Sequence, residues 1–317
     1  MAAQSYIEMG GRINSDSDNT KSLVEQFGHM SVNTKNSTSD INDSFEIVIP
    51  SGPTFRSLCV FFEETCSSGH FIVMSEGMIF SQYQNKTSPS DEDDLVLNRA
   101  EIFSCELPIF KFNSSSGTYA FHISPSLFKN RLGKIPQKAE ILLRKESGNR
   151  DIEITILNHT SGTVVYSPIV QDYNNYEIED DESIKPLCVV RTTDFSNTIA
   201  HMISNQIFYV VVYPKDNKLC CSGYEKIGTY VGTWSFSGEA PKMETSRSKF
   251  QLNIVDKKEF KIGLSLLRIL PTLSQLNKKS CVRFYAYYSN DGTFNRLKLV
   301  SHIGSYGYLS TYIRSCD

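Results

Sequence analysis

The hydrophobic pattern of the chain repeats one unit, which consists of a short strand, an amphipathic helix and a meander of three strands. The unit is clearest between residues 187 and 236, where Cys188 to Arg191 has the composition of a strand. The helix that follows carries an apolar stripe at helical spacing, made of Phe195, Ile199, Met202 and Ile203. Strands then run from Ile207 to Tyr213 and beyond a turn at Lys215-Asp216-Asn217.

Three further units have the same order. In the first, Ser51-Gly52-Pro53 opens a helix whose apolar face is Phe55, Leu58, Cys59 and Phe62. In the second, a helix is predicted from Pro125 to Ile135, with Gly133 as a weak point in its interior. In the fourth, a strand from Phe250 to Asp256 precedes a helix that begins near Phe260.

Residues 171–186 interrupt the repeat, because they have neither a helical nor a strand period and carry six acidic residues against Lys185. We therefore predict an α+β protein with two similar domains, each with two helices packed on antiparallel sheets. The predicted boundaries are a disordered tail over 1–44, one domain over 45–171, a connector over 172–187 and a second domain over 188–317.

The composition of the chain limits the classes of function that it can have. The 317 residues carry a formal net charge of −3, which argues against a generally basic nucleic-acid coat but allows a local basic patch. No apolar run is long enough for a membrane span, and no signal peptide is recognisable. The eight cysteines form no C-x-x-C pair, so we expect buried thiols in a reducing, intracellular compartment.

The chain shows no motif of an enzyme. It lacks a P-loop, a nucleophile elbow, an H-E-x-x-H motif and a dinucleotide fingerprint. The acidic run Asp91 to Asp94 is read as a solvated loop rather than a metal site. We therefore expect no catalytic residue, no metal and no cofactor.

Four stretches resemble the sliding clamps of DNA replication, and among them the proliferating cell nuclear antigen (PCNA) family. They are Gly77 to Gln82, Thr193-Asp194-Phe195, Tyr213 to Gly223 and Gly307 to Tyr312. The resemblance extends from Phe45 to Ile313 with the stretches in the family's order. It implies the DNA-clamp fold and a homotrimeric ring, without catalytic activity, that encircles double-stranded DNA independently of sequence.

In this resemblance the ring is a processivity factor that tethers DNA polymerase and other replication and repair proteins. The extra N-terminal residues and the loop at 85–94 suit a divergent, viral-type member, placed in the nucleus or at a cytoplasmic viral replication site. Two alternatives stay open. One is a clamp-fold checkpoint or late-transcription factor, or a subunit of a hetero-ring, and the other is an unrelated structural protein.

Basic residues in or beside the helices are the candidates for DNA contact: Arg56, Lys129, Arg131, Lys134 and Arg268. Phosphate contact needs positive charge but no base-edge chemistry, and the alternative is an ordinary solvated face. The third helix has Asn197 and Ala200 where the family usually has basic residues.

The resemblance also implies interfaces between proteins. Edge strands at Thr163 to Gln171 and Gly228 to Ser237 would pair between subunits, with apolar contact from Val164, Tyr166, Tyr230 and Trp234. Clients would dock a short hydrophobic peptide on the connector through Tyr173, Tyr176, Ile178 and Ile184, above a floor that includes Tyr312 and Ile313. Lys215 matches the position at which the eukaryotic family is modified by ubiquitin-like proteins, although an ordinary surface lysine is the simpler reading.

Overall fold

The computed structural model describes residues 32–37, 41–85, 95–133, 135–157, 164–166, 173–176, 184–216, 218–237, 242–244, 260–288, 292 and 294–314. The chain divides into two compact units. One unit, called the body below, comprises Asn36–Tyr173 and Glu182–Asp317, and the other combines Met1–Lys35 with Asn174–Asp181. None of the described helices is long and apolar enough to cross a membrane.

The first half of the body contains two of the predicted units. Its elements are, in chain order, β2 (Ser44–Ile49), α2 (Gly52–Thr65), β3 (Cys66–Met74), β4 (Gly77–Asn85), β5 (Leu95–Phe103), the 3-10 turn η1 (Ser104–Glu106), β6 (Ile109–Asn113), β7 (Thr118–Ile123), α3 (Pro125–Leu132), β8 (Glu140–Lys145), β9 (Ile152–Leu157) and β10 (Val164–Tyr166). The predicted order of strand, helix and meander is confirmed in both units.

The second half repeats this order. Its elements are β12 (Cys188–Arg191), α4 (Thr192–Ser204), β13 (Tyr209–Lys215), β14 (Lys218–Tyr224), β15 (Tyr230–Phe236), β16 (Lys242–Glu244), β17 (Phe260–Gly263), α5 (Leu264–Ile269), the 3-10 turn η2 (Leu270–Thr272), α6 (Leu273–Leu276), β18 (Cys281–Tyr288), β19 (Phe294–Ile303) and β20 (Gly307–Arg314). The strand predicted at Phe250 to Asp256 lies outside the described residues, and Phe260 begins a strand rather than a helix.

Two segments depart from the predicted boundaries. Val32–Ser37, within the predicted disordered tail, forms β1, and Tyr173–Tyr176, at the start of the predicted connector, forms β11. These two strands make a two-stranded sheet. Residues 1–31 of the predicted tail lie outside the described residues.

Helix α3 ends earlier than its hydrophobic pattern predicts. Gly133 has a φ of +52°, and its N–H donates to the carbonyl oxygen of Lys129 at 3.1 Å. Glycine adopts this left-handed conformation without the clash that a Cβ atom causes, so it closes helices. The residue interpreted as a weak point inside the helix is therefore its terminator.

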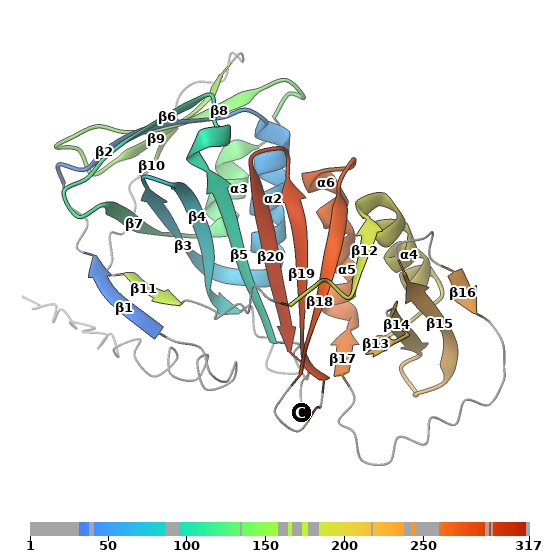
Figure 1. Cartoon of the computed structure of the whole chain (residues 1–317). Coiled ribbons are helices and arrows are strands. Elements are labelled where there is room, and N and C mark those ends of the chain that lie inside the picture. The colour runs from blue at the N-terminus through green and yellow to red at the C-terminus, as the bar shows by residue number, and fades with distance from the viewer. Residues whose placement is uncertain are drawn as a thin grey trace, which may run out of the picture. The chain divides into compact units, whose positions relative to one another are not determined.

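The two halves are joined by a single continuous sheet of eight strands in the order β12-β18-β19-β20-β5-β4-β3-β7 (Figure 1). The joint is the antiparallel ladder between β20 and β5, which runs from the pair Gly307–Ile102 to the pair Arg314–Leu95. Two five-stranded sheets flank it, in the orders β10-β9-β8-β2-β6 and β16-β15-β14-β13-β17.

The strand orders show that the halves are built alike. The runs β10-β9-β8-β2 and β20-β19-β18-β12 correspond, and so do β5-β4-β3-β7 and β15-β14-β13-β17. In this correspondence β20 and β5 are the partners of the internal joint. Their counterparts β10 and β15 lie at or next to the outer edges of the flanking sheets.

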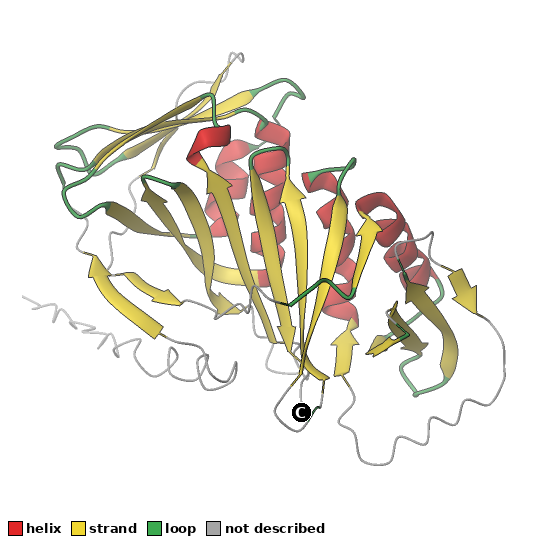
Figure 2. Ribbon diagram, viewed as in Figure 1, coloured by secondary structure: helices red, strands yellow, loops and turns green. Residues whose placement is uncertain are grey.

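The helices form a layer on one face of the sheets. α2 packs against α3, α5 and α6, and α4 packs against α5, η2 and α6. Figure 2 shows this layer in red. The labels of Figure 1, which has the same view, place α2 and α5 behind strands β18 to β20. One side of each helix therefore contacts the sheets, and the other is turned away from them.

Aromatic residues dominate the core between the helices and the sheets. The predicted apolar face of α2 is confirmed, because Phe55, Leu58, Cys59 and Phe62 are at most 1% exposed. Phe62 stacks on Phe80 of β4 with ring centroids 3.8 Å apart. Each fully buried side chain of this size stabilises the fold by about 1.5–3 kcal/mol.

Candidate nucleic-acid interface

The surface of the helix layer that faces away from the sheets is the first candidate for DNA contact. Described helices place three cationic side chains there or beside it, Arg56, Lys129 and Arg268, against the acidic residues Glu63, Glu64 and Asp194. The remaining exposed positions are small or polar, and Asn197 and Ala200 of α4 are both exposed. This surface is therefore close to neutral.

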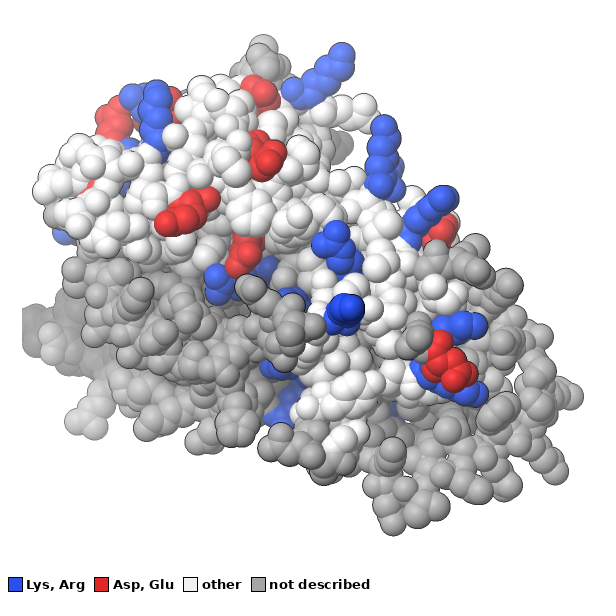
Figure 3. Space-filling view, viewed as in Figure 1, with Lys and Arg blue, Asp and Glu red and all other residues white. Residues whose placement is uncertain are grey.

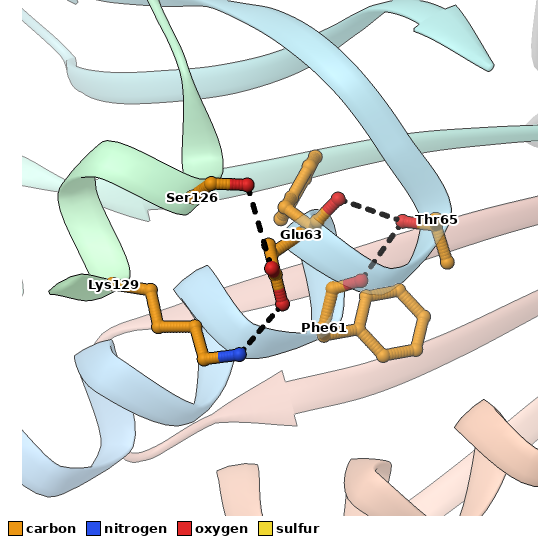
Figure 4. A network of polar contacts seen from close by, with 6 residues as sticks. Phe61, Glu63, Thr65, Ser126 and Lys129 are labelled. Atoms are coloured by element: carbon orange, nitrogen blue, oxygen red, sulfur yellow. Dashed lines mark hydrogen bonds and ion pairs between the residues drawn. The ribbon is translucent and has the colours of Figure 1, made fainter. Parts of the chain in front are cut away.

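Lys129 forms an ion pair in this layer. Its Nζ lies 2.7 Å from the Oε2 atom of Glu63, and the two side chains are 30% and 18% exposed. Figure 4 shows the Glu63 carboxylate between Lys129 and Ser126, whose hydroxyl donates to it at 3.4 Å. The positive charge of Lys129 is thus offset by an acid of the neighbouring helix.

The other four candidates differ in their surroundings. Arg56 donates from Nε to the carbonyl oxygen of Gly133 and so ties α2 to the end of α3. Arg268 is exposed in the last turn of α5, which packs against α2. Arg131 lies on α3, but its side chain is outside the description, and Lys134 lies outside the described residues altogether. The structure therefore brings Arg56, Lys129 and Arg268 to one layer, and their contact with DNA stays a prediction.

The predicted subunit edges require one correction. Tyr230 is 44% exposed at the start of β15, whereas Trp234 of the same strand is 2% exposed and donates from Nε1 to Nδ1 of His201 at 3.4 Å. Trp234 therefore belongs to the core, and the expectation that it supplies apolar contact to a neighbour is wrong. Val164 and Tyr166 lie on β10, the edge strand of its sheet.

Strand β15 is also partly covered. β16 pairs with its residues Thr233, Trp234 and Ser235, and no described strand pairs with the outer edge of β15 at Tyr230–Gly232. β10 is three residues long, shorter than the strand predicted at Thr163 to Gln171. An edge-to-edge contact between copies would thus have a shorter ladder than the internal joint.

The predicted client site is only partly described. Ile184 is half-buried, Tyr173 and Tyr176 lie on β11, and Ile178 lies outside the described residues. Ile313 is fully buried in the main core, so its predicted role as an accessible floor is wrong. Tyr312 points to the other face of β20, where it is 2% exposed and Lys298 Nζ lies 5.2 Å from its ring centre. Tyr312 is therefore not accessible in this structure either.

Lys215 ends β13 and is exposed next to Asp216, which has a φ of +50° in the hairpin turn. Asn217, the third residue of the predicted turn, lies outside the described residues. Modification of Lys215 is untested by the structure and stays a prediction.

The described residues hold no cluster of histidine, cysteine, aspartate or glutamate that could bind a metal ion. All seven described cysteines are free thiols. Burial raises the pKa of Cys59 and of Cys221, and it raises the pKa of Cys188 to about 12. These thiols are therefore protonated near neutral pH.

Sequence analysis did not single out a second set of basic residues, on strands β12, β18, β19, β20 and β5. They are Arg191, Arg283, Arg296, Lys298, Arg314 and Arg99. A count of charges at alternate strand positions would have found them, since every second residue of a strand points to the same face of the sheet.

Comparisons with known proteins give the fold. No protein-family model and no curated protein sequence matches the chain. Among solved structures, the PCNA2–PCNA3 complex of Sulfolobus tokodaii matches with a TM-score of 0.61 and 14% identity, over 86% of this chain and 100% of that chain. The proliferating cellular nuclear antigen of Entamoeba histolytica matches with a TM-score of 0.59 and 9% identity, over 86% of this chain and 98% of that one. The chain has the PCNA-like clamp fold, as the resemblance predicted.

Proposed function

We propose that this chain is a DNA sliding clamp, which forms a ring around duplex DNA and tethers DNA polymerase and other replication and repair proteins to it. The observation that carries the proposal is the internal joint between β20 and β5. Its counterparts β10 and β15 lie at opposite flanking sheets of the body. If β10 of one copy pairs with β15 of the next, each contact repeats the internal joint.

Such head-to-tail contacts generate a ring when the rotation closes. The resemblance to the PCNA family implies three copies, and the clamp fold supports a ring with the helix layer turned toward the DNA. A layer with few free positive charges suits a protein that slides, because weak contact with phosphates leaves it mobile and independent of base sequence.

The finer features of the proposal follow the family. Client proteins dock a short hydrophobic peptide on the connector, through Tyr176, Ile178 and Ile184. Lys215 is the candidate site for a ubiquitin-like modifier. The protein acts inside the cell in a reducing compartment, in the nucleus or at a cytoplasmic viral replication site.

Native mass spectrometry tests the ring directly. We expect a particle of three copies of the 35.8-kDa chain. Tyr230→Glu places a charge at the open end of β15 and should lower the fraction of trimer. Tyr288→Glu is the matched control, because Tyr288 is 53% exposed on β18, away from β10 and β15. A wild-type protein that is monomeric at micromolar concentration would contradict the proposed ring. An equal loss of trimer in the Tyr230→Glu and Tyr288→Glu variants would also contradict it.

A second assay tests the function. The ring should lengthen the products of its cognate DNA polymerase on primed circular DNA, and Tyr230→Glu should remove this stimulation. Oligomers that assemble normally but stimulate no polymerase would favour a different role for the same fold.

The main alternative is a subunit of a hetero-ring, including a clamp-fold checkpoint or late-transcription factor. Strand β16 favours it, because it covers half of the edge that a second copy would use. A partner with a short edge strand would fit the open part at Tyr230–Gly232. Failure of the pure chain to trimerise, followed by trimer formation with a second protein, would support this alternative.

A further inference from the structure

The two-stranded sheet joins a segment near the N-terminus to the connector. Its strands β1 (Val32–Ser37) and β11 (Tyr173–Tyr176) are hydrogen-bonded to each other through their backbones (Figure 1). The compact unit that contains this sheet comprises Met1–Lys35 and Asn174–Asp181. These connector residues therefore group with the N-terminal residues rather than with the body, and the chain pairs with part of its own proposed docking segment.

The local sequence does not account for this pairing. β1 reads Val-Asn-Thr-Lys-Asn-Ser, in which Val32 is the only apolar residue, and β11 reads Tyr-Asn-Asn-Tyr. Asparagine is depleted in strands, so neither segment is a strand by its own propensity. The reason for the pairing therefore lies in how the two segments are attached to the rest of the chain.

Short tethers attach both strands to one sheet of the body. Residues 38–43 separate β1 from β2, and residues 167–172 separate β10 from β11. β2 and β10 belong to the same five-stranded sheet. Two segments that are tethered in this way meet at an effective concentration in the millimolar range, so even a weak backbone ladder forms.

The same pairing is easy to open. A sheet of only two strands is marginally stable in water, and β11 is four residues long. β1 has no aromatic residue that could anchor it, and its only charged residue is Lys35. β1 is therefore a weak occupant of the connector, held in place mainly by its tether.

The charge of the connector favours a different occupant. Figure 3 shows cationic and acidic side chains interspersed on the described surface in view. Residues 171–186 differ, because they carry six acidic residues against Lys185. A peptide with several basic residues beside aromatic anchors gains more from this stretch than β1 gains with Lys35, because opposite charges speed association and aromatic anchors carry much of the binding energy.

We propose that Val32–Ser37 is an autoinhibitory strand, which occupies one edge of β11 until a basic, aromatic client peptide displaces it. This inference rests on the proposed docking of clients at the connector. Successive residues of a strand present their backbone groups to opposite edges, so the pairing withdraws about half of the hydrogen-bonding groups of β11 from a client. The apparent affinity for a client then falls in proportion to the fraction of open chains.

The test uses the full chain with the double substitution Asn33→Pro and Thr34→Pro. Proline donates no N–H, and neighbouring residues face opposite edges, so one of the two prolines interrupts the ladder in any register. The matched control is Asn19→Pro with Thr20→Pro, which makes the same change in the same dipeptide outside β1.

Two measurements are made on the wild type and both variants. Hydrogen exchange followed by mass spectrometry reports the protection of the backbone amides of β11 and needs no client. Fluorescence anisotropy reports binding of a short labelled peptide that has two adjacent aromatic residues and a pair of lysines at each end.

We expect faster exchange in β11 only in the variant with Asn33→Pro and Thr34→Pro. This variant should also bind the peptide about fivefold more tightly than the wild type and the control do, which corresponds to about 1 kcal/mol. Unchanged exchange in β11 would overturn the inference, and so would faster exchange with equal peptide affinity in all three proteins. Absence of peptide binding to all three would refute docking at the connector, and the inference with it, even where exchange confirms the pairing.

Discussion

The ion pair between Lys129 and Glu63 gives the sharpest prediction about DNA contact. Lys129 Nζ lies 2.7 Å from the Glu63 carboxylate, within the helix layer. While this pair is intact, Lys129 contributes little net charge to a phosphate. Glu63→Gln removes the competing acid and keeps the size of the side chain, so Lys129 becomes available to the duplex.

The magnitude follows from counterion release. Each phosphate that a cation neutralises adds about 0.9 to the slope of the logarithm of the binding constant against the logarithm of salt. Glu63→Gln should therefore make this slope steeper by about 0.9 for every Lys129 side chain that comes into contact with a phosphate of the duplex. The variant should lose about 0.5–1 kcal/mol of folding stability, since the pair is only partly buried.

Fluorescence anisotropy with a short duplex, over a series of salt concentrations, measures the slope. Glu64→Gln is the matched control, because Glu64 is exposed on the same helix and gives the same charge change one residue away. Lys129→Ala should have little effect in the wild-type background and should cancel the gain in the Glu63→Gln background. If Lys129→Ala weakens binding equally in both backgrounds, the ion pair does not mask Lys129 and our reasoning is wrong.

Three further predictions concern stability and assembly. Met243→Pro should disrupt the pairing of β16 with Trp234 and tighten self-association, as measured by sedimentation equilibrium; unchanged association would show that β16 does not compete with a neighbouring copy. Phe62→Ala should cost about 3–5 kcal/mol in denaturant unfolding, because it leaves a cavity against Phe80. Burial and His122 lower the pKa of His70 from 6.5 to about 4, so the unfolded chain binds a proton more readily and the free energy of unfolding should fall as pH drops from about 6.5 to 4. The loss attributable to His70 should be on the order of 2–3 kcal/mol and should be absent in His70→Phe.

Helix α2 was predictable from the sequence because its signals are local. The spacing of Phe55, Leu58, Cys59 and Phe62 defines one face of α2 without reference to the rest of the chain. Long-range features had no such signal. Nothing in the composition of β20 indicates that its partner is β5, so the sequence did not predict the strand pair that joins the two domains.

The error at Trp234 has a specific cause. Tyr230 and Trp234 are separated by an even number of residues, so a regular strand would place both on the same face. The register of β15 with β14 shifts between Gly223 and Tyr224, where Tyr224 pairs with Tyr230 but Gly223 pairs with Gly232. This bulge inserts one residue and reverses the alternation. Tyr230 is therefore exposed while Trp234 is buried.

The joint between β20 and β5 also constrains the order in which the protein folds. Gly307 pairs with Ile102 and Arg314 with Leu95, so β5 of the first domain can pair only after β20 of the second domain has been made. During synthesis from the N-terminus, β5 is made long before β20, and this edge of β5 stays unpaired in the meantime. Contacts this distant in sequence slow folding and leave an unpaired strand edge that favours aggregation. We therefore expect the growing chain to need protection by chaperones until β20 has emerged from the ribosome.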